Sequence, residues 1–152
     1  MYPQTHFLAA LFLGEVLLKL GVLSQKTVVV CAVLAVLIDL DHWAAFMIRH
    51  HEFSLKKAWN AATVKHENER TFIHHRTGFI IMAAILLITF LFNRLVFWVL
   101  GTAYLSHMFL DYVHVIEKKN FRFKELGFWI NITGFELVLD FVLIFVIILL
   151  LV

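Results

Sequence analysis

Acidic and imidazole side chains follow a strongly apolar stretch of this chain, and these residue types do acid–base and metal chemistry. Asp39, Asp41 and His42 come directly after the apolar run 28–37, with no polar segment between. Ionisable groups at membrane depth are costly, so they face a partner, a cavity or an ion. The remaining elements must therefore supply partners for these groups.

Metal binding is the chemistry that this pattern favours. His107 and Asp111 are four residues apart and share a helix face, as do Asp39 and His42 at a spacing of three. Imidazoles with carboxylates are ligands for Zn²⁺ or a similar first-row ion, and a spare carboxylate orients a ligand or acts as a general base. On a regular helix Asp41 would point about 160° away from Asp39. Asp41 therefore binds a second ion, forms a hydrogen bond to a ligand of the first ion, or marks a point where the helix unwinds.

Composition indicates the class of protein that must position these groups. Hydrophobic residues make up 62% of the 152 residues, with 16 Phe and 1 Pro, and the mean hydropathy is +0.87. A soluble domain is only about half apolar. We therefore expect an all-α integral membrane protein, without a cleaved signal peptide, because the start lacks a basic region. The lone Cys31 cannot form an intrachain disulfide.

Five apolar runs of helix length predict a five-helix transmembrane bundle that forms one domain over residues 1–152. The expected spans are residues 7–23, 27–48, 77–92, 95–115 and 135–152. Interfacial amphipathic segments are expected after spans two and four. In the first of them, the apolar residues at helical spacing are Phe53, Leu55, Trp59, Ala62 and Val64.

Smaller signals concern the ends of the spans. Thr133 and Glu136 have capping-box spacing for the last span, so Glu136 is more readily a helix cap than a ligand. Asp140, one turn deeper, has no such explanation, and a role in the site stays open. Glu15 and Lys19 have the spacing of a structural ion pair.

The distribution of basic residues predicts orientation. Ten of the 13 Lys and Arg residues fall on the side that holds the N-terminus and both long links. The positive-inside rule makes that side cytoplasmic and places the C-terminus outside the cell membrane. These basic residues are expected to contact anionic lipid head groups rather than nucleic acid.

Polar groups from every span reach one depth. At ~1.5 Å per residue, Asp39 and His107 lie roughly 16 and 18 Å along their spans, both toward the cytoplasmic side. His6 and His74 open their own spans at that side. This convergence predicts one pocket in the cytoplasmic half of the bilayer.

The same residues resemble a known family, the small inner-membrane, metal-dependent hydrolases similar to YdjM, which are described as phospholipase-like. The resemblance covers nearly all of the first four spans. It rests on Thr5-His6, Asp39-Leu40-Asp41-His42, the segment from Glu69 to His75, and His107-Met108-Phe109-Leu110-Asp111. It implies that the metal and active-site residues include His6, Asp39, Asp41, His42, His74, His107 and Asp111.

The third motif departs from the family pattern. Glu69 stands where the family has its first His, Arg70 is kept, and Ile73 and His75 replace the Thr and Ser around His74. Glu69, His66 or His75 is then expected to take the missing role.

These observations predict a membrane-embedded hydrolase acting on a phosphoester such as a phospholipid or other lipid phosphate. One or two Zn²⁺ ions would activate water, Asp41 or Glu69 would accept its proton, and Arg70 or Arg76 would hold the anionic group. The ligands would be His6, Asp39, His42, His74, His107 and Asp111. The alternatives are a metal-ion or proton transporter and a non-catalytic membrane subunit whose metal staples the helices. The chain has no serine nucleophile elbow, glycine-rich phosphate loop or paired-cysteine motif.

Overall fold

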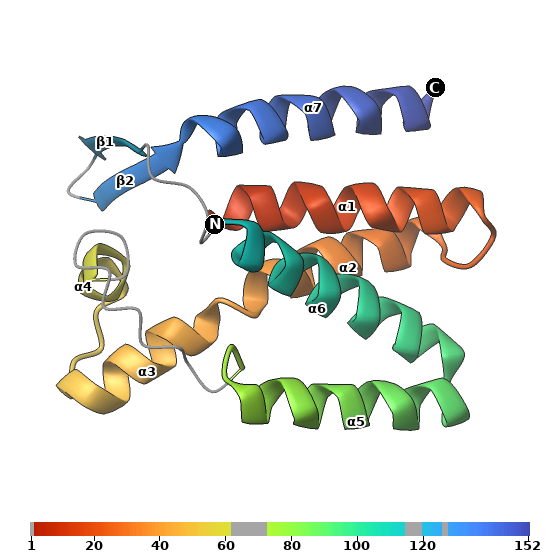
Figure 1. The fold of residues 1–152 in the computed structure, drawn as a ribbon, viewed down its shortest axis with the longest axis horizontal. Helices are drawn as coiled ribbons and strands as arrows, with labels where there is room; N and C mark the ends of the chain where they lie inside the picture. The colour runs from red at the N-terminus through yellow and green to blue at the C-terminus, as the bar shows by residue number, and fades with distance from the viewer. Residues whose placement is uncertain (1, 62–72, 115–119, 126–127) are drawn as a thin grey trace.

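A computed structural model describes residues 2–61, 73–114, 120–125 and 128–152, and this part of the chain is mostly helical (Figure 1). Each expected span corresponds to helix. The elements are α1 (Pro3–Lys19), α2 (Gln25–Leu37), α3 (Leu40–His50), α4 (Leu55–Asn60), α5 (Arg76–Phe92), α6 (Arg94–His114), β1 (Asn120–Glu125), β2 (Phe128–Thr133) and α7 (Gly134–Leu151).

Local signals fix several helix starts. Ser24 caps α2, and Thr133 and Glu136 form the expected capping box at the start of α7. The expected pair of Glu15 and Lys19 is not formed. Glu15 is buried and accepts a hydrogen bond from Gln25 Nε2 at 2.8 Å, because the turn between α1 and α2 brings Gln25 beside it.

The span expected at 27–48 is not one continuous helix, because α2 ends at Leu37 and α3 begins at Leu40 with a change of direction (Figure 1). At the break, the N–H of Asp39 donates to the carbonyl of Val36 at 3.2 Å, and the N–H of His42 donates to that of Asp39 at 3.2 Å. These bonds step back three residues instead of four, as in a 3₁₀ turn. Neither Pro nor Gly stands there, and the Asp39 side chain makes no capping hydrogen bond. Aspartate is a poor helix former in itself.

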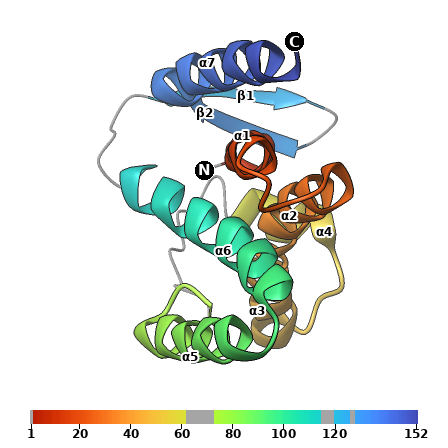
Figure 2. The same cartoon turned by 90° about the vertical axis from the view of Figure 1, so that its right-hand side faces the viewer.

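Helix α1 is the centre of the bundle. Figure 2 shows it nearly end-on, between α7 on one side and α2 and α6 on the other. Its inner contacts are made by small residues, because Ala10 packs with Ala32, Ala35 and Ala103 in one buried cluster. Small side chains let helix backbones approach closely, which is the usual packing mode of helices in membranes.

The outer helices carry long apolar surfaces. Large side chains such as Ile80 and Leu87 on α5, and Phe141 and Phe145 on α7, are exposed. Within the described residues, two helical stretches are long and apolar enough to cross a membrane, Gln25–His50 and Gly134–Leu151, and Arg76–Phe92 is a shorter apolar helix. The bundle of five spans stays a prediction.

The two polar links differ from expectation. The second contains a two-stranded antiparallel hairpin in which Asn120 pairs with Thr133 and Glu125 with Phe128, so the fold is not wholly α. The first strand alternates Phe with polar residues, and the second is rich in aromatic and β-branched residues, a composition that favours strands over a helix. In the first link, α4 covers only six residues. Ala62 and Val64, which were expected to extend it, lie outside the described residues.

Candidate metal centre

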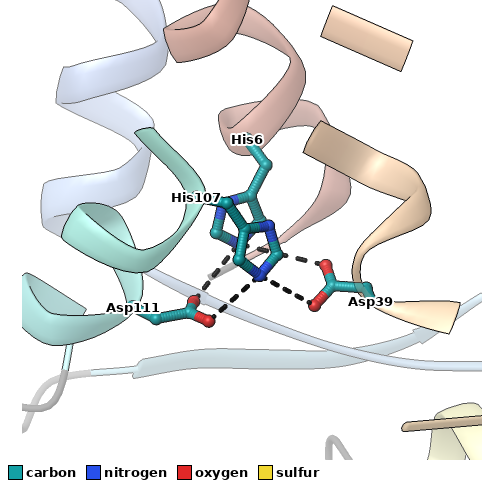
Figure 3. Close-up of side chains that lie close together, drawn as sticks. All are labelled: His6, Asp39, His107 and Asp111. Carbon is teal, nitrogen blue, oxygen red and sulfur yellow. Dashed lines mark ion pairs between the residues drawn. The ribbon is translucent and has the colours of Figure 1, made fainter. Parts of the chain in front are cut away.

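Four side chains from two helices and a helix break converge where α1 begins, α2 ends and α6 nears its C-terminus (Figure 3). His6 comes from the first turns of α1, Asp39 from the break between α2 and α3, and His107 and Asp111 from successive turns of α6. One nitrogen or oxygen of each lies within 4.8 Å of the others. The expected convergence of these four residues is therefore present in the fold.

The distances suit a small metal ion. His6 Nε2 lies 3.2 Å from Asp111 Oδ1 and 3.9 Å from Asp39 Oδ2. His107 Nε2 lies 3.3 Å from Asp111 Oδ2 and 3.5 Å from Asp39 Oδ1. Ligands on a tetrahedral Zn²⁺ with bonds of about 2.0–2.1 Å are separated by roughly 3.3 Å. The two imidazoles face different oxygens of each carboxylate, at distances of the order found between ligands of one ion.

Burial supports the same interpretation. His6 and His107 are fully buried, and their rings stack with centroids 3.9 Å apart. Neither ring nitrogen of His6 makes a hydrogen bond of acceptable geometry. Buried polar atoms are rarely left without a partner. A metal ion between the imidazoles and the carboxylates would satisfy Nε2 of His6.

The backbone fixes the tautomer of His107. Its Nδ1 lies 2.8 Å from the carbonyl oxygen of Ala35, so Nδ1–H is the donor. In a regular helix that carbonyl would accept from the N–H of Asp39, which instead bonds to Val36. The break thus frees a buried carbonyl. The neutral His107 ring then directs the lone pair of Nε2 toward the site that it shares with the other three candidate ligands. Ligating histidines commonly have such a carbonyl behind them.

A second group of three donors adjoins the first. It consists of Asp39, His42 and His74, and Asp39 belongs to both groups. His74 Nε2 lies 3.1 Å from His107 Nε2 and 3.1 Å from Asp111 Oδ2. All six predicted metal ligands therefore lie in one continuous cluster, to which the segment before α5 contributes His74.

Asp41 contacts His74 from the far side of the ring. Its Oδ2 lies 3.2 Å from His74 Nδ1. Burial lowers the pKa of His74, but the hydrogen bonds to Asp111 and Asp41 outweigh it and raise that pKa to about 9. The His74 ring without metal is therefore a cation held between two carboxylates. On a regular helix, Asp39 and Asp41 would point about 160° apart. Because the helix is interrupted at Asp39, both carboxylates contact the same cluster.

Among the described residues, the two donor groups contain none of the other candidates. Arg76 and His75 are exposed at the start of α5. Glu69, Arg70 and His66 lie outside the described residues. Glu136 and Asp140 belong to neither donor group, and Glu136 is engaged in the capping box. The Ala35 carbonyl could not be found from the sequence, since every residue carries one.

A comparison with family models identifies the chain. The model of the YdjM inner membrane protein family matches residues 1–121. The chain belongs to this family. No curated protein and no solved structure matches it. The YdjM match includes all six predicted ligands and ends within β1, before α7, and membership makes this an inner-membrane protein.

Proposed function

We propose that this YdjM family protein is a membrane-embedded, metal-dependent hydrolase that cleaves a phosphoester of a membrane lipid. The observation that supports it best is the set of donor atoms on His6, Asp39, His107 and Asp111, spaced as around one ion. Intramembrane ionisable residues mark functional sites by default. A cluster that combines imidazoles with carboxylates suits zinc better than magnesium or calcium.

One ion would be held by His6, Asp39, His107 and Asp111. The adjoining group of Asp39, His42 and His74 offers ligands for a second, with Asp39 shared between them. Zinc, when bound, supplies a Lewis acid for a phosphoryl oxygen and makes water a nucleophile near neutral pH.

The protein's own side chains divide the remaining tasks. Asp39 and Asp111 are 25% and 24% exposed, whereas His6 and His107 are fully buried, so the carboxylates form the accessible side of the cluster. Asp41 holds the His74 ring by its Nδ1. We propose Asp41 or Glu69 as the proton acceptor, and Arg70 or Arg76 as the cation that binds the phosphate.

The lipid substrate follows from location. We propose five spans with the N-terminus and the cluster toward the cytoplasm, so that a phospholipid or other lipid phosphate enters from the inner leaflet. Exposed basic side chains of α3 and α4, including Arg49, Lys56 and Lys57, suit anionic head groups. Exposed apolar residues Ile48, Phe53 and Leu55 stand beside them, an interfacial composition.

A transporter has less support. It needs polar groups through the full membrane depth. Glu15 is buried near the far end of α1, but the buried face between it and His6 consists of Ala9, Ala10 and Gly14. These small apolar side chains have no group that could bind an ion along a path between Glu15 and His6.

Elemental analysis of the purified protein tests the metal site. We expect one or two equivalents of zinc in the wild type, and a loss of most of it in His107→Ala and Asp39→Ala. Glu52→Ala is the control, because Glu52 is a partly exposed carboxylate paired with Lys57 outside the cluster. Unchanged metal content in both cluster variants would overturn the proposal.

Turnover separates the enzyme from the alternatives. Protein in mixed phospholipid vesicles should release a phosphorylated head group or inorganic phosphate, and His107→Ala should reduce the rate at least about a hundredfold. Stoichiometric metal without turnover of any lipid phosphate would indicate a structural staple. Zinc uptake into proteoliposomes without ester cleavage would indicate a transporter.

A further inference from the structure

A buried glutamate links α7 to the start of α1. Glu136 is fully buried in the first turn of α7. Its Oε1 accepts a hydrogen bond from the backbone N–H of Tyr2 at 2.7 Å, across 134 residues of sequence. Its Oε2 accepts from the backbone N–H of Thr133 at 3.1 Å. One carboxylate thus caps its own helix and holds the N-cap residue of another.

The bond to Tyr2 leads directly to His6. Tyr2 is the N-cap of α1 and has no side-chain cap of its own. Its carbonyl accepts from the N–H of Thr5 at 3.1 Å and from that of His6 at 3.3 Å. Tyr2 is therefore held on both sides, by Glu136 at its N–H and by the first turn of α1 at its carbonyl. Because His6 lies in that turn, the position of its ring depends on where Tyr2 is held.

This link comes from outside the part of the chain that carries the cluster. The match to the YdjM family ends at residue 121, whereas Glu136 lies on α7. Helix α7 also packs along α1 through Leu143, which is buried with Ala9 and Leu110. The apolar contact fixes how close the helices lie, while the carboxylate fixes the first turn of α1 in position. Hydrogen bonds to a carboxylate are shorter and roughly twice as strong as bonds between neutral groups.

We propose that Glu136 is a positioning residue of the metal centre, which sets the place of His6 through the backbone of Tyr2. The proposal rests on the proposed function, because it assumes that His6 is a metal ligand. Support behind a ligand matters: removing such partners typically costs 10–100-fold in metal affinity, and sites fail when ligands shift by about 1 Å.

The test uses the full chain in detergent, loaded with Co²⁺ or Zn²⁺. We expect Glu136→Leu to weaken zinc binding about 10–100-fold in competition with a chromophoric chelator, and to change the visible d–d spectrum of bound Co²⁺. Glu136→Gln keeps one oxygen, and with that oxygen toward Tyr2 the amide nitrogen stands beside the Thr133 N–H, so the cap is weakened but the bond to Tyr2 is kept. Zinc affinity should then stay within about threefold of wild type, with an unchanged cobalt spectrum.

Thr133→Val is the matched control for helix capping. It removes the hydroxyl that accepts from the Glu136 N–H at 3.0 Å but leaves the bond to Tyr2. It should lower thermal stability without altering the cobalt spectrum. If Thr133→Val changes the spectrum as much as Glu136→Leu does, Glu136 acts only as a cap and the proposal is wrong.

A second pair of variants tests the hydrogen-bond donor, the backbone N–H of Tyr2, and provides the test if Glu136→Leu does not fold. Tyr2→Pro lacks the N–H, and the Tyr2 φ of −79° suits proline. Tyr2→Ala loses the same ring but keeps the N–H. We expect weaker zinc binding and an altered cobalt spectrum in Tyr2→Pro relative to Tyr2→Ala. Equal values would overturn the proposal while leaving the metal site intact. A wild type that binds neither metal would instead overturn the proposed function, and this inference with it.

Discussion

At the scale of single residues, the cluster combines ligands with the groups that hold them. His107 is oriented by a main-chain carbonyl, and His74 by the carboxylate of Asp41. His6 has no such side-chain partner within the described residues and depends on the first turn of α1. These three imidazoles should therefore respond to different substitutions.

Asp41→Asn tests the support of His74. The amide keeps the shape of the carboxylate but loses its charge, so Nδ1–H of His74 is held more weakly and Nε2 becomes a poorer ligand. We expect zinc affinity to fall about 10-fold or more. A competition titration measures it, with Glu52→Gln as the control for a carboxylate outside the cluster. Equal affinities in the two variants would contradict this role of Asp41.

Zinc binding should release a proton from His74. The pKa of this ring, raised to about 9 by its two carboxylates against the opposing effect of burial, keeps it protonated at neutral pH. A metal ion on Nε2 must displace that proton. The apparent affinity should therefore rise with pH up to about 9, by at most about tenfold per unit for this proton. Calorimetry in buffers of different ionisation enthalpy counts the protons; no dependence on the buffer would contradict the assignment.

At the scale of elements, helix contacts of small residues set the geometry. The contact between α1 and α2 is close, because a Cβ on Gly14 would lie 2.8 Å from Val28 Cγ1. Val28 is fully buried and branched at Cβ, so it has little freedom to move away. The distance between α1 and α2 in turn sets where His6 lies relative to Asp39.

Gly14→Ala should destabilise the protein by about 1 kcal/mol, because overpacking outweighs the gain in helix propensity. Gly101→Ala is the matched control in α6, where the new Cβ would meet Leu86 Cδ2 at 3.8 Å, an ordinary contact. It should be neutral or stabilising. Thermal unfolding in detergent measures both, and Gly14→Ala combined with Val28→Ala should recover part of the loss. A stabilising Gly14→Ala would show that the helices separate freely.

At the scale of the whole molecule, the exposed apolar rows on α5 and α7 suit lipid rather than water. The family assignment agrees with a membrane location. An odd number of crossings would put the two ends of the chain on opposite sides. The orientation then follows from the basic residues of the two long links.

Fusion reporters test this arrangement. Alkaline phosphatase, which is active only outside the cytoplasm, should be active when joined after Val152, and green fluorescent protein there should stay dark. A fluorescent protein joined to the N-terminus should be bright. A bright C-terminal fusion would show an even number of crossings and would contradict the five-span arrangement.

The sequence by itself determined the apolar helices, the capping box at Thr133 and the six candidate ligands. The helices and the cap depend on local composition and spacing, which neighbouring residues alone decide. The six ligands were instead proposed from their shared depth along the spans and from the family resemblance. The hairpin was not predicted, because the aromatic and basic residues of that link were interpreted as an interfacial segment.

Only the tertiary structure decided how those ligands are held. The bond of His107 to the Ala35 carbonyl and the bond of Glu136 to Tyr2 join residues that are far apart in the chain. The break at Asp39 is local, and helix unwinding there was one of the alternatives that the spacing of Asp39 and Asp41 left open. A backbone carbonyl carries no signature of its own in sequence, and a helix cap looks the same whether or not its carboxylate also binds a distant N–H. Such contacts exist only after the helices have packed.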